Sequence, residues 1–272
     1  METREKFREF LCSIKNKKPL VHHITNYVTV NDCANIVLAL GGSPVMADAL
    51  EEAEDMVSIA SALVINIGTL NSSKVESMLK AGKKANELNI PVILDPVGVG
   101  ATSYRKETAL KLLEQIKFSV IRGNLAEIKT LYGMSALSKG VDSEEGDLQE
   151  GAAIAKLLSE KLESVVVISG ETDYVADGKK VISIKNGHRM LTEVTGTGCM
   201  STSLIGTYCT VTKDYFLAAA AGIMTMGIAG EIAFERLINN QGSGTFKTNL
   251  IDAIYNFSYK DIFERGKYEK EC

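Results

Sequence analysis

The sequence predicts an α/β protein in which helices flank a central, mainly parallel sheet. Short apolar runs of strand length recur along the chain, for example at residues 62–67 and 165–169, and segments with helical spacing separate them. The runs are apolar at consecutive positions, which is typical of strands that are buried on both faces. Strands that alternate with helices favour a sheet covered on both sides, and therefore a domain of three layers.

The first half of the chain alternates strand and helix. Residues 20–24 form a short apolar strand, and the helix predicted at about 29–40 ends at Gly41 and Gly42, because glycine often terminates helices. The same reasoning predicts strands at 62–67, 91–94 and 118–122, and helices at 72–88, 104–116 and 125–132.

The second half begins with a helix at about 148–162 and the strand at 165–169. Asp177 and Gly178 then lie between two β-prone runs, and this Asp-Gly pair predicts a hairpin. We expect the polar tail from Tyr259 to fray. No linker rich in Pro, Gly or Ser divides the chain, so residues 1–272 are expected to form a single domain. The remaining helices are predicted at 199–208, 214–237 and about 245–257.

Composition argues against several classes of protein. The net charge is −4 and no dense run of Lys or Arg occurs, so neither nucleic acid nor an anionic membrane is an expected partner. The five cysteines form no Cys-x-x-Cys pair, so neither a disulfide framework nor a structural zinc site is indicated. The N-terminus lacks the apolar core of a signal peptide, and the apolar stretch 216–230 is shorter than the ~20 residues of a spanning helix. We therefore expect a cytoplasmic protein with this stretch buried.

The segment Thr195-Gly-Thr-Gly-Cys199 precedes a predicted helix and is the strongest candidate for chemistry. Glycines let the backbone approach a ligand closely, and the amide groups of a helix start favour an anion such as a transferring phosphoryl group. Cys199 falls in the first helical turn, and a helix N-terminus can lower the pKa of a thiol. The thiol could then accept a proton from a substrate hydroxyl. The alternative is a glycine-rich turn followed by a buried cysteine.

Polar and charged residues also follow two other predicted strands. Asp95 ends a buried strand and is a candidate magnesium ligand, or else it caps the next turn. Asn124 and Glu127, three residues apart at a helix start, could orient a magnesium–phosphate unit or could simply cap that helix. Arg122 could bind a phosphate or pair with an acid. The sequence leaves each of these pairs of alternatives open.

The loops beyond the strands contribute further candidates, because ligands of such sheets bind at the carboxyl ends of the strands. Ser169 could donate a hydrogen bond to a nucleotide, or it could belong to a plain turn. Asn26, Met46 and Gly68 could line an apolar pocket that has one polar group. No Gly-x-x-x-x-Gly-Lys-Ser/Thr segment occurs, so a P-loop kinase is excluded.

Seven short segments stand in a specific order along the chain, and together they cover it from about residue 20 to 210. They are Val21-His-His-Ile-Thr-Asn26, Gly42-Ser-Pro-Val-Met46, Asn66-Ile-Gly-Thr69, Val92-Ile-Leu-Asp-Pro-Val-Gly98, Ile121-Arg-Gly-Asn-Leu-Ala-Glu127, Ile168-Ser-Gly-Glu171 and Thr195-Gly-Thr-Gly-Cys199. In this order the chain resembles the hydroxyethylthiazole kinases, which belong to the ribokinase-like family. The set is specific to that family, although each segment by itself is a weak signal.

The resemblance implies a three-layer ribokinase-like fold and an activity. Members of the family phosphorylate the primary alcohol of 4-methyl-5-(2-hydroxyethyl)thiazole with ATP and magnesium, and so salvage the thiazole half of thiamine. The family also forms homotrimers with sites at the subunit interfaces, which the residues alone do not indicate. The wider family usually has an aspartate at the position of Cys199, and a cysteine there resembles the pattern of the thiazole-kinase branch.

The same resemblance implies a role for each candidate residue. Met46 and Gly196 would contact the thiazole, with Asn26 and Gly68 nearby, and Cys199 would take the place of the catalytic base. The ATP-binding residues would be Arg122, Asn124 and Ser169, and the residues that organise magnesium and phosphates would be Asp95 and Glu127. Two small departures, Thr197 in place of the common Ala and Ser169 in place of the common Thr, remove no group that is needed.

Three competing functions remain from the sequence. A kinase for pyridoxal or hydroxymethylpyrimidine would have the same fold, but the Met46 region and Cys199 fit it less well. A cysteine hydrolase would need a base beside Cys199, and the histidines are His22, His23 and His188. His22 and His23 are neighbours on a strand and point to opposite faces, so they are interpreted as structural. A nucleotide sensor without turnover is the third alternative.

Overall fold

The computed structural model describes residues 2–131 and 144–271. Within them, nine strands form one sheet in the order β2-β1-β3-β4-β5-β6-β7-β8-β9. Pairing is parallel from β2 to β6 and antiparallel from β6 to β9. The strands are β1 (Leu20–Ile24), β2 (Ser43–Met46), β3 (Ala62–Asn66), β4 (Val92–Asp95), β5 (Val120–Asn124), β6 (Val165–Ser169), β7 (Asp173–Ala176), β8 (Val181–Ile184) and β9 (Tyr268–Glu271).

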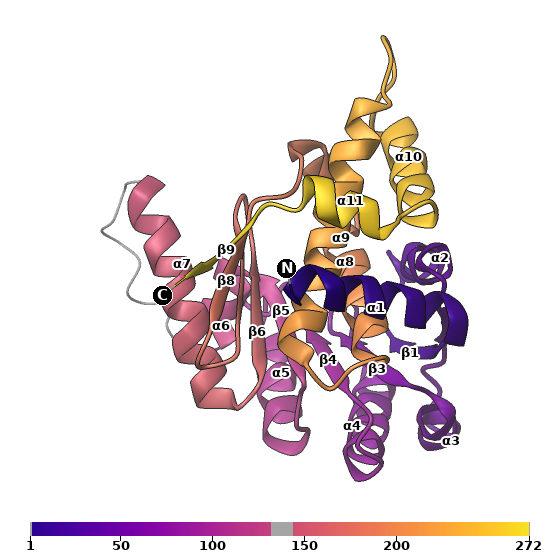
Figure 1. Ribbon diagram of the computed structural model, residues 1–272. Helices are drawn as coiled ribbons and strands as arrows, with labels where there is room; N and C mark the ends of the chain where they lie inside the picture. The colour runs from indigo at the N-terminus through magenta and orange to yellow at the C-terminus, as the bar shows by residue number, and fades with distance from the viewer. Residues whose placement is uncertain (1, 132–143, 272) are drawn as a thin grey trace.

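Helices cover both faces of the sheet (Figure 1). One hydrophobic core lies between one face of the sheet and the helices α1 (Glu2–Lys17), α2 (Val30–Leu40), α8 (Thr197–Cys209), α9 (Tyr215–Glu235) and α10 (Ser243–Tyr255). The other is formed with α3 (Ala53–Ile59), α4 (Ser72–Glu87), α5 (Ser103–Gln115), α6 (Leu125–Leu131) and α7 (Glu144–Leu162). Strand residues alternate between the cores: Val64 belongs to the first, while Leu63 and Ile65 belong to the second. The predicted three-layer α/β fold with a mainly parallel sheet is confirmed.

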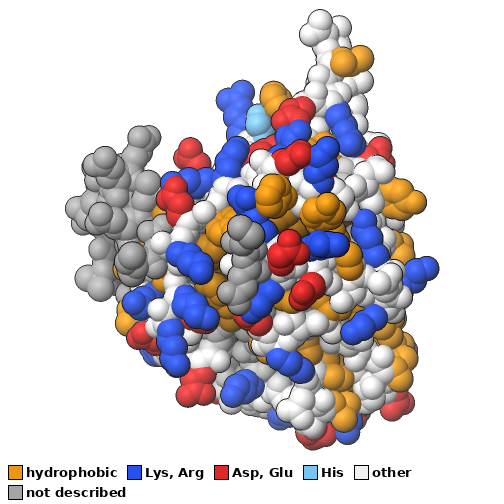
Figure 2. Space-filling model, viewed as in Figure 1, with side chains coloured by type: hydrophobic (Ala, Val, Ile, Leu, Met, Phe, Trp, Pro, Cys, Tyr) orange, Lys and Arg blue, Asp and Glu red, His pale blue; other side chains and the backbone are white. Residues whose placement is uncertain are grey.

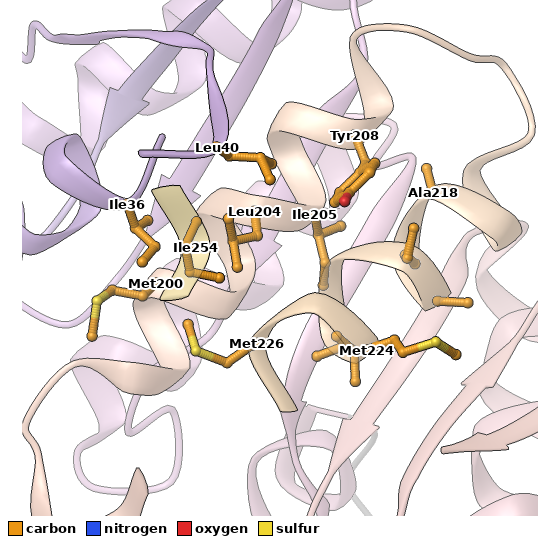
Figure 3. Close-up of a cluster of buried hydrophobic side chains, with 14 of the residues drawn as sticks. Ile36, Leu40, Met200, Leu204, Ile205, Tyr208, Ala218, Met224, Met226 and Ile254 are labelled. Carbon is orange, nitrogen blue, oxygen red and sulfur yellow. The ribbon is translucent and has the colours of Figure 1, made fainter. Parts of the chain in front are cut away.

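Helix α8, which carries Cys199, is held between the sheet and α9. Figure 3 shows Leu204, Ile205 and Tyr208 of α8 among the side chains of this core. A Cβ at Gly222 of α9 would lie within 2.8 Å of the Ile205 backbone, so the two helices approach closely only because glycine stands there. The fully buried Tyr208 hydroxyl and Thr225 Oγ1 lie 2.9 Å apart in a hydrogen bond. The start of α8 is therefore fixed by packing along the length of the helix.

The expectation that the apolar stretch 216–230 is buried is confirmed. It lies in α9, which has the length and apolarity of a membrane-spanning helix, but 89% of its most apolar window is buried inside the protein. On the outer surface seen in Figure 2, Lys and Arg side chains are spread over the whole face with acidic side chains between them. This face therefore presents a mixed surface and not a broad stripe of one charge.

The prediction that the tail from Tyr259 frays is wrong. Ser258 and Asp261 form a capping box that starts α11 (Tyr259–Arg265), and Ile262 is almost completely buried. The chain then adds β9 to the otherwise open edge of β8. Lys267 Nζ also lies 3.1 Å from Glu231 Oε1 of α9. The tail is ordered because it covers a sheet edge, which is a tertiary effect.

Other elements were not predicted. The first is α1, whose buried Phe7, Phe10, Leu11 and Ile14 have helical spacing. The second is the edge strand β2, at residues that read as a loop, and it is followed by α3. The predicted Asp-Gly hairpin is confirmed between β7 and β8, and a 3₁₀ helix (Arg189–Glu193) precedes α8. Of the helix predicted at 125–132, Tyr132 lies outside the described residues.

Candidate active site

The site lies where the carboxyl ends of the central strands meet the start of α8. Asn66 ends β3 and Asp95 ends β4, side by side in the parallel register. Gly196 precedes α8 with a φ of +90°, and a Cβ there would lie 2.5 Å from Thr29 Cγ2. Glycine is therefore required both by the backbone conformation and by the close approach of Thr29. The first turn of α8 places Cys199 in the same region.

A network of hydrogen bonds joins Cys199 to Asp95. Asn66 Nδ2 donates to Asp95 Oδ2 (2.8 Å) and to Cys199 Sγ (3.3 Å). Asn26 Nδ2 donates to Asn66 Oδ1 (3.0 Å) and also to Cys199 Sγ (3.4 Å). All four side chains are buried. Asn66 was not predicted as a site residue, although a polar side chain at the end of the apolar strand Ala-Leu-Val-Ile-Asn was a signal for it.

The interpretation that the helix start lowers the pKa of Cys199 is wrong. Burial, and to a lesser extent the negative charge of Asp95, raises the pKa of the thiol to about 12. The hydrogen bonds from Thr29 and Asn26 oppose this effect but are weaker. The thiol is therefore protonated at neutral pH, and in this resting arrangement it is a hydrogen-bonding group and not a thiolate.

Asp95 is completely buried and carries an oxygen that is available for a ligand. Burial raises its pKa to about 6, while the positive charge of Arg122 lowers it and the negative charge of Glu127 raises it. Oδ2 accepts hydrogen bonds from Asn66 and from Thr202 Oγ1 (3.0 Å). Oδ1 has no hydrogen-bond partner among the described residues. At neutral pH the carboxylate is therefore charged, and one of its oxygens remains free.

Asn124 and Glu127 form the capping arrangement that the sequence left open as one alternative. Asn124 Oδ1 accepts from the Glu127 amide (2.9 Å), and Glu127 Oε2 accepts from the Asn124 amide (2.9 Å). Glu127 Oε1 in addition accepts from the amide of Gly98 (2.9 Å), in the turn after Asp95. Glu127 thus ties the helix start to the loop that follows β4, and Asn124 is exposed at its edge.

Arg122 and Ser169 lie together in a cavity of about 860 Å³. Arg122 Nη2 donates to Ser169 Oγ (2.7 Å), and Arg122 Nε is buried without a hydrogen-bond partner among the described residues. A Cβ at Gly198 would lie 2.6 Å from Arg122 Nη1, so glycine at this position makes room for the guanidinium. The cavity extends from this end along α9, where Ile223, Met226 and Gly227 line it. It has the volume of a small-molecule site, and two arginines, Arg122 and Arg189, line it together with the acidic Glu171 and Asp173.

Asp173 also lines this cavity and was not identified from the sequence. Its Oδ1 accepts a hydrogen bond from the Gly170 amide (3.0 Å). Burial nevertheless raises the pKa of its carboxyl to about 7, because it outweighs this bond and the charge of Arg122. The charge of the cavity therefore changes near neutral pH.

Comparison with known proteins decides the family. The model of the Hydroxyethylthiazole kinase family matches residues 11–260. The chain belongs to the hydroxyethylthiazole kinase family. A hydroxyethylthiazole kinase from Alkaliphilus oremlandii is 58% identical over 270 residues, which are 99% of this chain and 100% of that protein. One from Clostridium tetani is 57% identical over 271 residues, or 98% of each chain. The resemblance inferred from the seven segments is confirmed.

Solved structures agree with this assignment. A hydroxyethylthiazole kinase from Pyrococcus horikoshii superposes with a TM-score of 0.90 at 39% identity, over 98% of this chain and 100% of that one. The pyridoxal kinase from Staphylococcus aureus in complex with ADP has a TM-score of 0.58 at 17% identity, over 79% of this chain and 88% of that one. The latter likeness concerns the fold alone, and together with the hydroxyethylthiazole kinase structure it confirms the expected ribokinase-like fold.

Of the residues expected around the acceptor of a hydroxyethylthiazole kinase, none lines the Arg122 cavity as far as the structure is described. The Gly68 amide donates to Asn66 Oδ1 (2.8 Å), and a Cβ at Gly68 would lie 3.0 Å from Asn26 Cβ. Asn26 and Gly68 are thus brought together with Cys199. Met46 ends the edge strand β2 opposite His23, so β1 separates it from Gly68.

The histidines have structural contacts, as interpreted from the sequence for His22 and His23. His22 Nε2 lies 2.7 Å from the carbonyl oxygen of Ala47, and His23 Nε2 lies 3.1 Å from Ser203 Oγ. Burial lowers the pKa of both, that of His23 to about 4. His188 stacks on the ring of Phe234 with centroids 3.6 Å apart. Among the described residues no histidine is hydrogen-bonded to the Cys199 thiol: His23 reaches Cys199 only through Ser203, whose Oγ donates to the Cys199 carbonyl oxygen (3.0 Å), and His188 lines the Arg122 cavity.

The site also fits a magnesium ion shared with phosphates. Magnesium is commonly held by one or two carboxylates together with substrate phosphates and waters. The free Oδ1 of Asp95, with Glu127 close enough to raise its pKa, matches such a donor set. Within the described residues, no group of three or more His, Cys, Asp or Glu side chains could hold a metal alone. The donors therefore suit a shared ion and not one enclosed by protein.

Proposed function

We propose that the protein transfers the terminal phosphoryl group of ATP to the hydroxyl of 4-methyl-5-(2-hydroxyethyl)thiazole, in thiamine biosynthesis or salvage. One observation carries this proposal within the kinase family. The hydrogen-bonded network Cys199–Asn66–Asp95 lies at the start of α8, is joined to Asn26 and Gly68 through Asn66, and is next to Gly198, which lines the Arg122 cavity. A donor and an acceptor that occupy the two sides would meet at the amides of this helix start.

On the nucleotide side, Arg122 and Ser169 bind ATP in the 860 Å³ cavity. The unpartnered Nε of Arg122 leaves the guanidinium a further donor for a phosphate oxygen. The backbone amides around Gly198 stabilise the charge of the migrating phosphoryl group, because a helix start favours anions. Asn124 does not line the cavity but is assigned to the nucleotide side because it pairs with Ser169 in the strand register.

Asp95 and Glu127 would hold magnesium, which when bound neutralises negative charge on the phosphates. Asp95 contributes its free Oδ1, and its charge at neutral pH follows from a pKa of about 6. Glu127 acts chiefly by positioning, because both its oxygens accept backbone hydrogen bonds. Positioning and charge stabilisation supply most of the rate in phosphoryl transfer.

On the acceptor side, Met46, Gly196, Asn26 and Gly68 bind the thiazole. Cys199 stands at the position of the catalytic base, and its high pKa defines how it acts. The protonated thiol orients the acceptor hydroxyl by a hydrogen bond but cannot accept its proton, which passes to a phosphoryl oxygen only late in the transfer, when the phosphoryl group has largely left ATP. In a loose transition state the acceptor hydroxyl needs little activation by a base before that point.

We further propose that the chain is one domain that acts as a cytoplasmic homotrimer. The continuous sheet from β2 to β9 supports the single domain. Tyr27 and Val28 follow Asn26 directly and are 64% and 66% exposed. Apolar side chains exposed beside a site are typical of an interface. Light scattering on the purified protein tests the assembly, and a monomeric mass would contradict it.

The decisive experiment measures ATP consumption with a panel of alcohols: the thiazole alcohol, pyridoxal and hydroxymethylpyrimidine. We expect kcat/KM for the thiazole alcohol to exceed the others by at least about 100-fold. Preference for another alcohol would refute the substrate assignment, and ATP binding without any phosphorylated product would favour a sensor. A cysteine hydrolase is disfavoured by the raised pKa of Cys199 and by the contacts of the histidines.

A further inference from the structure

Lys74 is a buried cation outside the network of the proposed site. It lies in the first turn of α4, and its side chain is only 2% exposed. Lysine is among the residues least often fully buried, and a positive charge near a helix start opposes the helix dipole. The helix dipole disfavours a lysine at this position, and the buried side chain is not solvated by water. Its contacts with other segments must compensate for its burial.

The ammonium of Lys74 meets three groups from two loops. Nζ lies 3.0 Å from Asp48 Oδ2 and donates to the carbonyl oxygen of Thr25 at 3.0 Å. It also lies 3.8 Å from the centroid of the Tyr27 ring, which is a close cation–π contact. Asp48 is in the loop after β2, whereas Thr25 and Tyr27 are in the loop after β1.

A third loop, after β3, is tied to the same group. The Tyr27 amide donates to Thr69 Oγ1 (3.1 Å), and Asn71 Nδ2 donates to the Tyr27 hydroxyl (3.5 Å). Asn71 caps α4 by accepting from the Lys74 amide (2.8 Å). The loops after three adjacent strands, in the sheet order β2-β1-β3, thus converge on one side chain and its aromatic neighbour.

Each of these loops carries or adjoins one expected acceptor residue. Met46 is two residues before Asp48, Asn26 lies between Thr25 and Tyr27, and Gly68 precedes Thr69. Lys74 and its partners do not line the Arg122 cavity in the described part of the chain. The ammonium is therefore placed to fix the loops of the acceptor side without touching those of the nucleotide side.

We propose that Lys74 is a positioning residue for the acceptor subsite. This proposal rests on the proposed function. The buried ammonium contacts Asp48, Thr25 and Tyr27, and through these contacts it fixes the positions of Met46, Asn26 and Gly68 relative to one another. Loss of the ammonium releases all three loops together, so the acceptor binds poorly while the nucleotide binds as before. A role in stability alone would not distinguish the two substrates.

The test compares Lys74→Met, Asp48→Asn and a matched control, Lys80→Met. Lys80 is on the same helix and pairs with Glu54 of α3 at 3.2 Å, with about half of each side chain exposed. We expect Lys74→Met to raise KM for the thiazole alcohol at least about tenfold while KM for ATP stays within about twofold. Asp48→Asn shifts the same constant in the same direction by about threefold, and Lys80→Met leaves both constants unchanged.

Equal changes in both KM values, or an unchanged KM for the alcohol, would overturn the proposal. Asp48 is 47% exposed, so Asp48→Asn folds and carries the test if Lys74→Met does not. Hydrogen exchange on the same variants needs no turnover. It should be faster in residues 25–28, 46–49 and 68–71 of Asp48→Asn than in Lys80→Met, and equal exchange in these segments would also overturn the inference. A wild type that phosphorylates none of the alcohols refutes the proposed function, while the exchange measurement still decides the role of Lys74.

Discussion

Replacing Asp95 by asparagine should stop the reaction and at the same time remove a pH-dependent cost to folding. Asp95 is completely buried, and burial raises its pKa from the usual 3.8 to about 6. Above both values the folded protein must hold a buried carboxylate. The amide of the Asp95→Asn variant keeps an oxygen for the bonds from Asn66 and Thr202 but carries no charge.

The magnitude follows from linkage. Because the pKa is higher in the folded state, the folded protein binds more protons than the unfolded chain between about pH 4 and pH 6. Stability therefore falls as the pH rises through this window and is level above it. Two pKa units correspond to about 3 kcal/mol, of which about 2 kcal/mol is lost between pH 4.5 and pH 7.5. The amide of the variant does not titrate, so the variant escapes this loss.

Urea unfolding at these two pH values measures the effect. Circular dichroism is a suitable signal, because the chain contains no tryptophan. The difference in unfolding free energy between Asp95→Asn and wild type should shift by about 2 kcal/mol in favour of the variant on going from the lower to the higher pH. Turnover of the variant should fall at least about 100-fold. A stability difference that is the same at both pH values would refute the reasoning from burial.

Three further predictions concern the two sides of the site. Cys199→Ala should bind both substrates with KM values within about twofold of wild type but turn over about 10- to 100-fold more slowly, as steady-state kinetics would show; wild-type turnover would remove Cys199 from the mechanism. Gly198→Ala should displace the Arg122 guanidinium, whose Nη1 would lie 2.6 Å from the new Cβ, and raise KM for ATP about tenfold; an unchanged KM would mean that this guanidinium does not bind the nucleotide. KM for ATP should rise as the pH increases through about 7, because Asp173 then becomes charged in the cavity; titration calorimetry on Asp173→Asn should show a flatter profile, and an identical profile would contradict this role.

The sequence was sufficient for the architecture because the central strands are unambiguous. Residues 62–65 and 165–168 are apolar throughout, and the structure buries them between two helical layers. The edges of the sheet were harder to predict. Strand β2 is only half buried and contains Pro44, and β9 becomes a strand because β8 offers it an open edge. The helix α1 differs from these, since its apolar spacing was present in the sequence and could have been used.

The candidate site divides in a similar way. Position along the chain was enough to place Asp95, Arg122 and Ser169 at one edge of the sheet, because parallel strands end together. The place of Cys199 beside Asp95 depends on how α8 packs against the sheet. The positions of these residues in the sequence did not predict their pKa values. The helix start suggested a low pKa for Cys199, whereas burial beside Asp95 raises it to about 12. Desolvation depends on everything packed around a group, and this cannot be read from its neighbours in the sequence.

The high pKa values of Cys199 and Asp95 have one physical origin. Both groups are buried where α8 packs on the strand ends, and this packing is held along the helix by Ile205 and Tyr208. The same exclusion of water that makes a charge costly here strengthens its attraction to an opposite charge. A buried carboxylate is thus unfavourable without a partner charge and favourable when a cation and phosphates are bound next to it. The pH-dependent difference in unfolding free energy between Asp95→Asn and wild type therefore measures how much stability the protein loses by keeping this charged group for its ligands.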